Sequence, residues 1–252
     1  TSGNQNLKPE SGETITYGIV LAPRFLEGLV VSFDYLEIDI TDAILSVSSQ
    51  NIVNKCYDSA TLANEFCALI SRNDDPASAQ SGGLDFLRQV QLNFGAAIYE
   101  GYDATASYDF MALDTAMRAS VSWSTVEKIL AIEQTGTEDN ELGEMRRPEN
   151  SATFSLSGIR GDFGLEYSGI YLDRQTLNYE GGTEIETVMT NFGPTAFTDE
   201  VTVHNIRGTY TGNGFTVYGG VNNFTDESPY IKELTYNVRQ IGRYFYLVAT
   251  MS

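Results

Sequence analysis

The stretch that decides the fold is the end of the chain, Gly242-Arg243-Tyr244-Phe245-Tyr246-Leu247-Val248-Ala249-Thr250-Met251-Ser252. A β-strand places successive side chains on opposite faces. One face of this stretch carries Phe245, Leu247, Ala249 and Met251, and the other carries Tyr244, Tyr246, Val248, Thr250 and Ser252. A terminal strand without a polar tail is expected to be paired rather than frayed. The stretch therefore predicts the last strand of a sheet.

The same alternation recurs along most of the chain and predicts about ten strands. Within one of them the parity of the apolar residues flips at Tyr35-Leu36, which indicates a bulge or a change of environment. Very short links are expected at 111–112, at Gly161-Asp162 and at 212–214. The other predicted strands cover 13–21, 29–40, 84–94, 99–110, 113–124, 151–157, 163–171, 201–211 and 215–221.

Long polar connections alternate with these short links, at 46–83, 136–149 and 173–199. The first could hold a short helix within 56–70, and its length suggests a functional or mobile segment. A soluble sandwich has shorter strands, with turns every 8–12 residues or so. Strands of 11 or more residues, joined by alternately short and long connections, are typical of outer-membrane barrels. The predicted fold class is therefore all-β: an antiparallel transmembrane β-barrel segment of about ten strands with long external loops.

Composition narrows the function classes. The formal net charge of −19 over 252 residues argues against a nucleic-acid partner, whose phosphates need clustered Lys and Arg. No run of about 18 apolar residues exists, so no spanning helix is expected, although spanning strands need only about 9–11 residues. The chain starts at Thr1 without a signal peptide, as a mature product or a fragment would.

Cys56 and Cys67 are the only cysteines, and they lie in one polar stretch. Free thiols, or a metal pair lacking further ligands, are the alternatives to a disulfide. No histidine lies nearby, and the external loops of a barrel are exposed to an oxidising environment. We therefore expect a structural disulfide between Cys56 and Cys67. In the chain-entropy model such a bridge stabilises the fold by about 3 kcal/mol.

Four segments, in order, resemble signatures of the TonB-dependent receptors. Asn4-Gln5-Asn6-Leu7-Lys8-Pro9-Glu10 is similar to the family's Asn-Pro-x-Leu-Lys-Pro-Glu. The strand with Asp34-Tyr35 and Ile40-x-Asp42-Ala43-Ile44 resembles the stretch that comes after this signature in the family. Gly220-Val221-Asn222-Asn223-Phe224-Thr225-Asp226 resembles Gly-Val-x-Asn-Leu-Phe-Asp, and Gly242-Arg243-Tyr244-Phe245-Tyr246-Leu247 resembles the closing Gly-Arg-x-Tyr strand. The resemblance spans essentially the whole chain.

The resemblance implies that residues 1–252 are the C-terminal portion of a 22-strand barrel, without the plug domain, the TonB box and the N-terminal barrel strands. It implies uptake of a ferric siderophore, vitamin B12 or an oligosaccharide across the outer membrane of a Gram-negative bacterium. The partners implied are outer-membrane lipid and, through the plug, the TonB complex. The family's last strand ends in an aromatic residue, whereas this chain stops at Ser252.

No catalytic residue, cofactor or metal site is expected. A ten-stranded outer-membrane protease would need an Asp–His pair to activate water, and the only histidine, His204, has just Asp199 near it in sequence. No Gly-x-Ser-x-Gly elbow occurs. Asp74-Asp75 and Glu138-Asp139 lack the spacing of a calcium loop and are interpreted as solvated charges.

Ligand-binding residues stay unknown at this level, with three groups as candidates. Asp103 and Asp109, with Thr105 and Ser107 between them, would line the lumen, as polar residues of any water-filled barrel do. Arg146 and Arg147 could meet an anionic ligand such as a ferric chelate. A ligand platform or an interfacial girdle could be formed by Tyr99, Tyr102, Tyr108, Trp123, Tyr167 and Tyr171.

Three hypotheses result. The first is a receptor and transporter, not an enzyme, in which loops 46–83 and 173–199 capture the ligand. The alternative is a self-contained ten-stranded outer-membrane enzyme, a protease or lipase, which predicts that strands 13–21 and 242–251 pair with each other. The third is a soluble β-sandwich binding module, which predicts an apolar core between two sheets.

Overall fold

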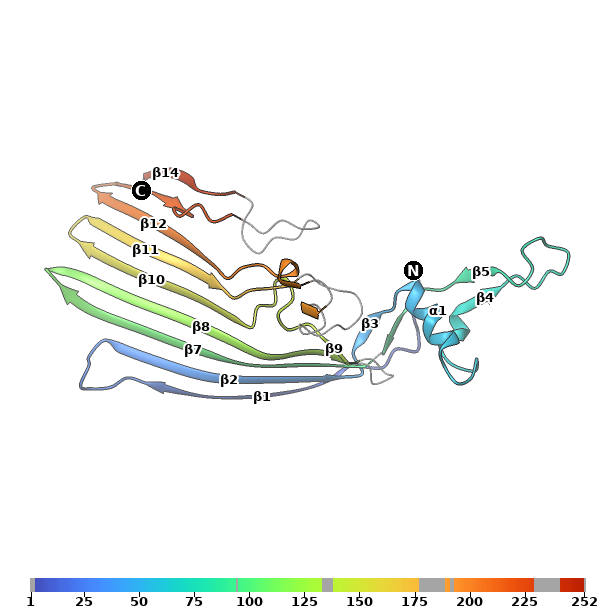
Figure 1. Ribbon diagram of the computed structural model, residues 1–252. Helices are drawn as coiled ribbons and strands as arrows, with labels where there is room; N and C mark the ends of the chain where they lie inside the picture. Colours follow the sequence, from blue (N-terminus) through green and yellow to red (C-terminus); the bar gives the residue numbers. More distant parts are fainter. Residues whose placement is uncertain are drawn as a thin grey trace. The chain divides into compact units, whose positions relative to one another are not determined.

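The computed structural model describes residues 3–93, 95–132, 138–176, 189–190, 193–228 and 241–251 (Figure 1). The chain divides into two compact units. The small unit comprises residues 1–13, 40–97 and 132–137, and the sheet unit comprises 14–39, 98–131 and 138–252. No helix in the described part of the chain is long and apolar enough to cross a membrane.

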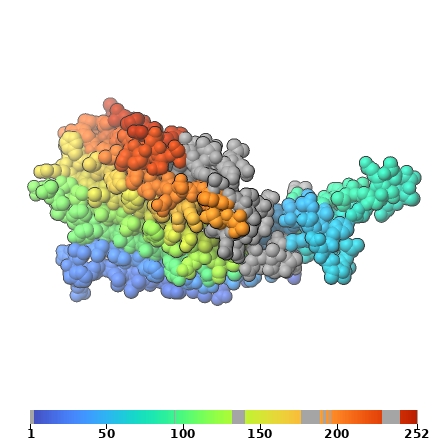
Figure 2. Space-filling view, viewed as in Figure 1, coloured from blue at the N-terminus to red at the C-terminus, as the bar shows by residue number. Residues whose placement is uncertain are grey.

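One ten-stranded sheet dominates the sheet unit, so the predicted all-β fold is confirmed. Its neighbours follow the order β1-β2-β7-β8-β10-β11-β12-β13-β14, with β9 paired to β8. In the space-filling view the colours pass across it from blue to red in chain order (Figure 2). The strands are β1 Ser11–Leu21, β2 Leu29–Thr41, β7 Ala96–Ala112, β8 Thr115–Ile132, β9 Glu138–Asn140, β10 Asn150–Arg160, β11 Phe163–Leu172, β12 Val201–Gly212, β13 Phe215–Asn222 and β14 Tyr244–Met251.

The sheet does not close on itself. β1 and β14 lie at its two ends and are not neighbours. The structure therefore contains a partial barrel wall. The pairing of 13–21 with 242–251, which the enzyme hypothesis requires, is not present among the described strands. The sandwich hypothesis is not met either, because the apolar face of this sheet is exposed rather than packed on a second sheet, with Phe245 74% and Leu247 78% exposed.

Short and long connections fall on opposite edges of the sheet, because successive strands run in alternating directions (Figure 1). We call them the turn edge and the loop edge. The turn edge holds the connections 22–28, 113–114, 161–162 and 213–214, and the loop edge holds 133–149, 173–200 and 223–243. The remaining long connection, 42–95, belongs to the small unit.

One turn differs from the prediction. The expected link at 111–112 is part of β7, and the chain reverses at Leu113-Asp114 instead. Leu113 and Asp114 have φ values of 48° and 57°. Positive φ at both central residues gives the type I′ turn that matches the twist of a hairpin. Neither residue is glycine, so the sequence carries no local signal for this turn.

Cross-strand register sorts the side chains into two faces, as the alternation predicts. Directly opposed residues share a face. On the apolar face Phe154 lies opposite Val121 and Gly169, and Leu156 lies opposite Ala119 and Tyr167. On the polar face Ser155 lies opposite Ser120 and Ser168. Its hydroxyl is 2.8 Å from that of Ser120.

The small unit is built from the connection that follows β2. Its elements are β3 Ile44–Ser46, helix α1 Ser49–Tyr57, the 3₁₀ turn η1 Cys67–Leu69, β4 Ile70–Arg72, β5 Leu84–Leu87 and β6 Gln91–Asn93. β3 pairs with β6, and β4 pairs with β5. The helix predicted within 56–70 begins earlier, at Ser49, because the hydroxyl of Ser48 caps it by accepting the Asn51 N–H at 3.2 Å. The predicted strand 84–94 is two short strands with different partners, and Phe94 lies outside the described residues.

A core of its own holds the small unit together. Val47, Ile52, Cys56, Phe66, Val90 and Leu92 are buried against one another. A disulfide joins Cys56 to Cys67, the pair expected from the sequence. The side chain of Asn64 bonds both ends of this loop: Nδ2 donates to the Cys56 carbonyl at 3.4 Å, and Oδ1 accepts the Cys67 N–H at 2.9 Å. The described part of this connection is thus a folded module.

Candidate functional site

Three long connections of the sheet unit could act at the loop edge, and two of them bond to each other. Glu144 bridges Thr176 in parallel fashion, and Thr176 bridges Phe197 in antiparallel fashion. We call this the loop platform, residues 141–147, 174–176 and 196–198. Its buried residues are Glu144, Met145, Gln175, Thr176, Ala196, Phe197 and Thr198. The platform is therefore a small packed structure rather than a loose loop.

Backbone bonds give the platform its order. The Thr176 N–H donates to the Gly143 carbonyl at 2.8 Å, and the Thr198 N–H donates to the Gln175 carbonyl at 2.7 Å. The hydroxyl of Thr198 accepts the Gln175 N–H at 2.9 Å, and that of Thr176 donates to the Ala196 carbonyl at 3.0 Å. Segments twenty or more residues apart in the sequence are thereby fixed against one another.

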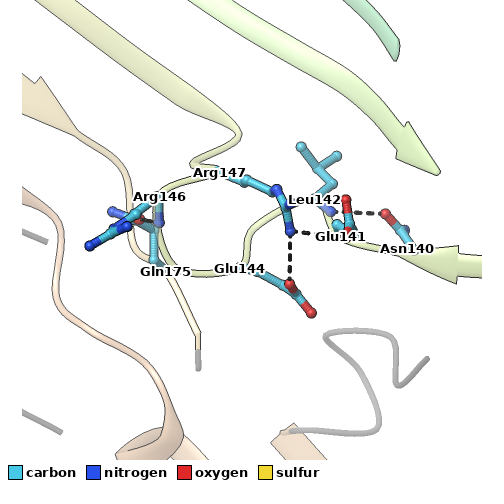
Figure 3. A network of polar contacts seen from close by, with 7 residues as sticks. All are labelled: Asn140, Glu141, Leu142, Glu144, Arg146, Arg147 and Gln175. Atoms are coloured by element: carbon cyan, nitrogen blue, oxygen red, sulfur yellow. Dashed lines mark hydrogen bonds and ion pairs between the residues drawn. The ribbon is translucent and has the colours of Figure 1, made fainter. Parts of the chain in front are cut away.

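Gln175 lies at the centre of the loop platform, with 1% of its surface exposed. Its Oε1 accepts the backbone N–H of Arg146 at 2.5 Å (Figure 3). Arg146 has a φ of 73°, a conformation that costs a residue other than glycine some energy and needs support from its surroundings. Gln175 supplies that support. Its Nε2 is buried and has no hydrogen-bond partner among the residues that the structure describes.

The two predicted arginines have different roles (Figure 3). The Arg147 guanidinium pairs with Glu141 at 3.1 Å and with Glu144 at 3.4 Å, so it holds the platform together. Arg146 is exposed, and within the described residues its side chain makes no ion pair. Of the pair, Arg146 alone keeps a cation available to an anionic ligand.

A cavity of about 260 Å³ adjoins the platform. Phe197 and Pro194 form part of its wall, and the Arg174 guanidinium lies 5.3 Å from the centre of the Phe197 ring. Asp199 and Glu200 also line it. The cavity thus offers both signs of charge beside an aromatic ring, and the sequence alone did not identify it.

The polar face carries the other predicted group. Thr105 lies 2.7 Å from Ser32, hydroxyl to hydroxyl, and Asp109 pairs with Arg118 at 3.5 Å. Glu166 and Arg207 form a similar cross-strand pair at 2.9 Å. A shallow cavity of about 410 Å³ spans this face, lined largely by the hydroxyls of Thr105, Ser107, Ser120, Ser122, Thr153, Ser155 and Ser168. These residues make a polar wall of small side chains.

His204 lies on the apolar face, where it is directly opposite Gly169. Its Nδ1 is 2.8 Å from the Tyr167 hydroxyl, and its ring is within 6.1 Å of Phe154 and 5.7 Å of Phe224. Asp199, the carboxylate near it in sequence, is not among its described contacts. The histidine belongs to an aromatic cluster and not to an Asp–His pair.

The predicted aromatic residues do not converge on one platform. Trp123 stacks on Tyr171 at 5.7 Å, Tyr108 on Phe110 at 5.0 Å, and Tyr102 on Phe33 at 5.5 Å. Tyr99 makes no ring contact with these residues. A second aromatic cluster, absent from the sequence prediction, lies at the turn edge: Phe163 is 4.9 Å from Tyr210, which is 5.7 Å from Phe215.

Within the small unit the N-terminal signature segment is anchored by Asn93. The Asn93 Oδ1 accepts the Lys8 N–H at 2.8 Å, and its Nδ2 donates to the carbonyls of Lys8 and Asp42 at 2.9 and 2.7 Å. Glu10 accepts the Ile44 N–H at 2.5 Å. Two signature segments that are about thirty residues apart therefore contact each other directly.

Of the two acidic pairs, the structure describes the side chains of Asp74-Asp75. Asp75 Oδ1 accepts the Ala77 N–H at 2.9 Å, which shapes a turn. The side chains of Glu138 and Asp139 lie outside the described residues. In the described part of the chain no cluster of three or more His, Cys, Asp or Glu residues could hold a metal ion.

Comparison with known families decides the identity. The family model described as TonB dependent receptor-like, beta-barrel matches residues 1–224. The chain belongs to this family. Comparison with curated proteins gives no match.

Solved structures of TonB-dependent receptors share the fold of this chain. A mutant of the ferric enterobactin receptor from Pseudomonas aeruginosa, in complex with enterobactin, matches at a TM-score of 0.66 and 16% identity. The siderophore receptor PirA from Acinetobacter baumannii matches at 0.62 and 14%, and the FrpB iron transporter from Neisseria meningitidis at 0.55 and 15%. Each match covers 98% of this chain and 32% of the other. The chain thus spans about a third of the length of these receptors.

Proposed function

We propose that the chain forms wall and loops of an outer-membrane receptor that takes up a scarce ligand, such as a ferric siderophore, in a Gram-negative bacterium. In this proposal residues 1–252 are the C-terminal portion of the barrel. A plug domain and the N-terminal barrel strands, supplied elsewhere, complete it, and TonB acts through the plug.

The observation that carries the proposal is the exposed apolar face of a single up-and-down sheet. Phe245, Leu247 and Met251 are 74%, 78% and 93% exposed, and Phe163 and Leu165 are 65% and 59% exposed. Soluble proteins rarely expose apolar patches of this extent. Contact with lipid removes such a face from water, while the hydroxyls and ion pairs of the polar face suit a water-filled lumen. Outer-membrane lipid is therefore the proposed environment.

The connections set the proposed orientation. In outer-membrane barrels short turns face the periplasm and long loops face the outside. The turn edge would then be periplasmic, and the loop platform and disulfide module would be external. A disulfide between Cys56 and Cys67 fits that side of the membrane.

The ligand class is inferred from the family and from one feature of the loops. The solved neighbours include a receptor bound to enterobactin and an iron transporter. The exposed Arg146 suits an anionic ferric chelate, while vitamin B12 and oligosaccharides are the other ligands of related receptors. The enzyme alternative loses support, since the sheet is open and His204 has an aromatic environment.

Uptake measurements test the proposal. A strain lacking the full receptor should lose accumulation of one ligand from a panel of catecholate and hydroxamate ferric siderophores, vitamin B12 and maltooligosaccharides. Complementation should restore it, and a strain lacking TonB should not be restored. Accumulation that is independent of TonB, or a receptor found only in the soluble fraction, would contradict the proposal.

A further inference from the structure

We propose that a groove on the apolar face, next to the turn edge, binds one anionic phospholipid of the periplasmic leaflet, with Arg160 meeting its phosphate. The inference rests on the proposed function, because it requires the apolar face to lie in a bilayer.

The groove is a cavity of about 320 Å³ between three strands of the sheet unit. Gly158 has no side chain, so the Met117 side chain lies directly over it, and the cavity opens above this point between Leu156 and Arg160, two residues to either side on β10. The directly opposed neighbours of Gly158, Met117 on β8 and Leu165 on β11, form the sides. Phe163 and Tyr167 on β11 also line the cavity. A groove lined mainly by apolar side chains accommodates an acyl chain.

The aromatic cluster of the turn edge indicates the depth of the groove. Phe163 is 4.9 Å from Tyr210, which is 5.7 Å from Phe215. Aromatic residues of outer-membrane barrels gather at the two lipid–water interfaces. Arg160 is directly opposite Phe163 in the register of β10 and β11. The guanidinium is therefore attached at the level of the lipid head groups.

The charge of Arg160 is available to a ligand. Arg118 and Arg207, on the polar face, have carboxylate partners at 3.5 and 2.9 Å. Arg160 is exposed and makes no ion pair with the residues that the structure describes. The nearest acid in the sequence, Asp162, lines with Glu166 and Arg207 an adjoining cavity, which shares Gly158, Phe163, Gly164 and Leu165 with the groove. Arginine presents a planar fork of donors that matches a phosphate group.

The apolar groove next to Arg160 distinguishes this site from an ordinary arginine at a membrane interface. A long cationic side chain at a membrane surface reaches the head groups without any groove beneath it. Here the groove supplies an apolar binding surface that ends at the cation, which fits one amphiphile with a single negative head group. Because the turn edge is periplasmic in the proposed orientation, that amphiphile is a phospholipid of the periplasmic leaflet.

Native mass spectrometry of the full receptor in neutral detergent tests the site. Phosphatidylglycerol and phosphatidylcholine with the same acyl chains are added stepwise. We expect one tightly bound phosphatidylglycerol, and Arg160→Gln should weaken its binding about tenfold, the loss expected from charge-assisted hydrogen bonds. Arg24→Gln is the matched control, since Arg24 lies in another turn-edge connection outside this groove.

A second variant tests the acyl-chain part of the groove. Gly158→Leu displaces the flexible Met117 side chain, whose sulfur lies 2.6 Å from the position of a Cβ on residue 158. The leucine and the displaced methionine fill the groove without changing charge and should weaken the binding of both lipids. Displacement of the lipid by inorganic phosphate or glycerophosphoglycerol would show a head-group site only and would overturn the groove. Equal losses in Arg160→Gln and Arg24→Gln, or no preference between the two lipids, would also overturn it. Those results in a receptor that still takes up its ligand would leave the proposed function standing, whereas loss of uptake in the unmodified receptor would count against the function itself.

Discussion

Asp226 and Arg243 join the two ends of the last long connection. Asp226 Oδ1 accepts the Arg243 backbone N–H at 2.8 Å, and Oδ2 pairs with Nη2 at 3.3 Å. Asn223, which has a positive φ of 51°, shapes the turn that carries Asp226. Its Oδ1 accepts the Glu227 N–H and its Nδ2 donates to the Glu227 carbonyl, both at 2.8 Å. The signature segments 220–226 and 242–247 are thus joined to each other. We call this contact of Asp226 with Arg243, between the end of β13 and the start of β14, the latch.

The latch should weaken in acid. The hydrogen bonds from Arg243, first from its backbone and then from its side chain, lower the pKa of Asp226. A carboxylate with a lowered folded-state pKa contributes stability above its ordinary value of 3.8, and that contribution is lost as pH falls through the folded-state pKa. Asp226→Ala should speed hydrogen exchange in Tyr244–Met251 at neutral pH. The difference from the unmodified protein should shrink below about pH 4.

Glu227→Ala is the control for the latch, since Glu227 bonds Asn223 through its backbone only. An exchange rate in β14 that is the same for Asp226→Ala and Glu227→Ala would show that the latch does not hold the strand.

Removing the disulfide should loosen the small unit while leaving the sheet intact. Replacing both Cys56 and Cys67 by serine should cost about 3 kcal/mol in the chain-entropy model, felt in residues 47–70. Hydrogen exchange measured with and without reductant checks this. In the unmodified protein, reductant should have the same effect on exchange as the double substitution. In the double variant, reductant should change nothing further. Equal protection of 47–70 in all four samples would contradict the prediction.

The Thr198 hydroxyl should contribute more to the stability of the loop platform than the Thr198 methyl group does. Thr198→Val is nearly isosteric but leaves the buried Gln175 N–H without its acceptor, at a cost of about 1–3 kcal/mol. Faster exchange across 141–147 and 174–176 is the expected readout. Thr198→Ser keeps the hydroxyl and should restore most of the protection, so a serine variant as exchangeable as the valine variant would assign the effect to packing instead.

Arg146 and Arg147 should separate ligand binding from stability. Arg147→Gln removes the cation shared by Glu141 and Glu144 and should destabilise the platform by about 1 kcal/mol, seen as faster exchange there. Arg146→Gln should leave exchange unchanged and lower the affinity of the receptor for an anionic chelate severalfold, measured by titration calorimetry. Faster exchange in Arg146→Gln, together with a loss of chelate affinity in Arg147→Gln alone, would contradict these two roles.

Much of the sheet was predictable because its signal is local. A two-residue period fixed which side of β8 carries Met117 and Val121 and which carries Ser120 and Ser122, and the register bears it out. The helix predicted within 56–70 is Ser49–Tyr57 in the structure, and the cap that could have placed it is Ser48. The turn at Leu113-Asp114 lacks glycine and gave no signal.

The candidate site was less predictable, because its contacts are nonlocal. The sequence drew attention to Arg146 and Arg147 but gave no means of telling them apart. That distinction depends on Gln175, 29 residues away, which binds the Arg146 backbone. Gln175 is in turn fixed by Thr198, 23 residues further on. No period or short motif encodes such contacts, and the lone polar residues carry no sign of burial.

The order of the strands has a consequence for closure. The path from β1 to β14 passes through nine strands whose arrows alternate in direction (Figure 1). In any alternating series of odd length the first and last members run the same way. β1 and β14 both run from the loop edge to the turn edge, so a seam between them would be parallel. An all-antiparallel cylinder needs an even total. Completing one therefore takes an odd number of additional strands, whichever polypeptide supplies them.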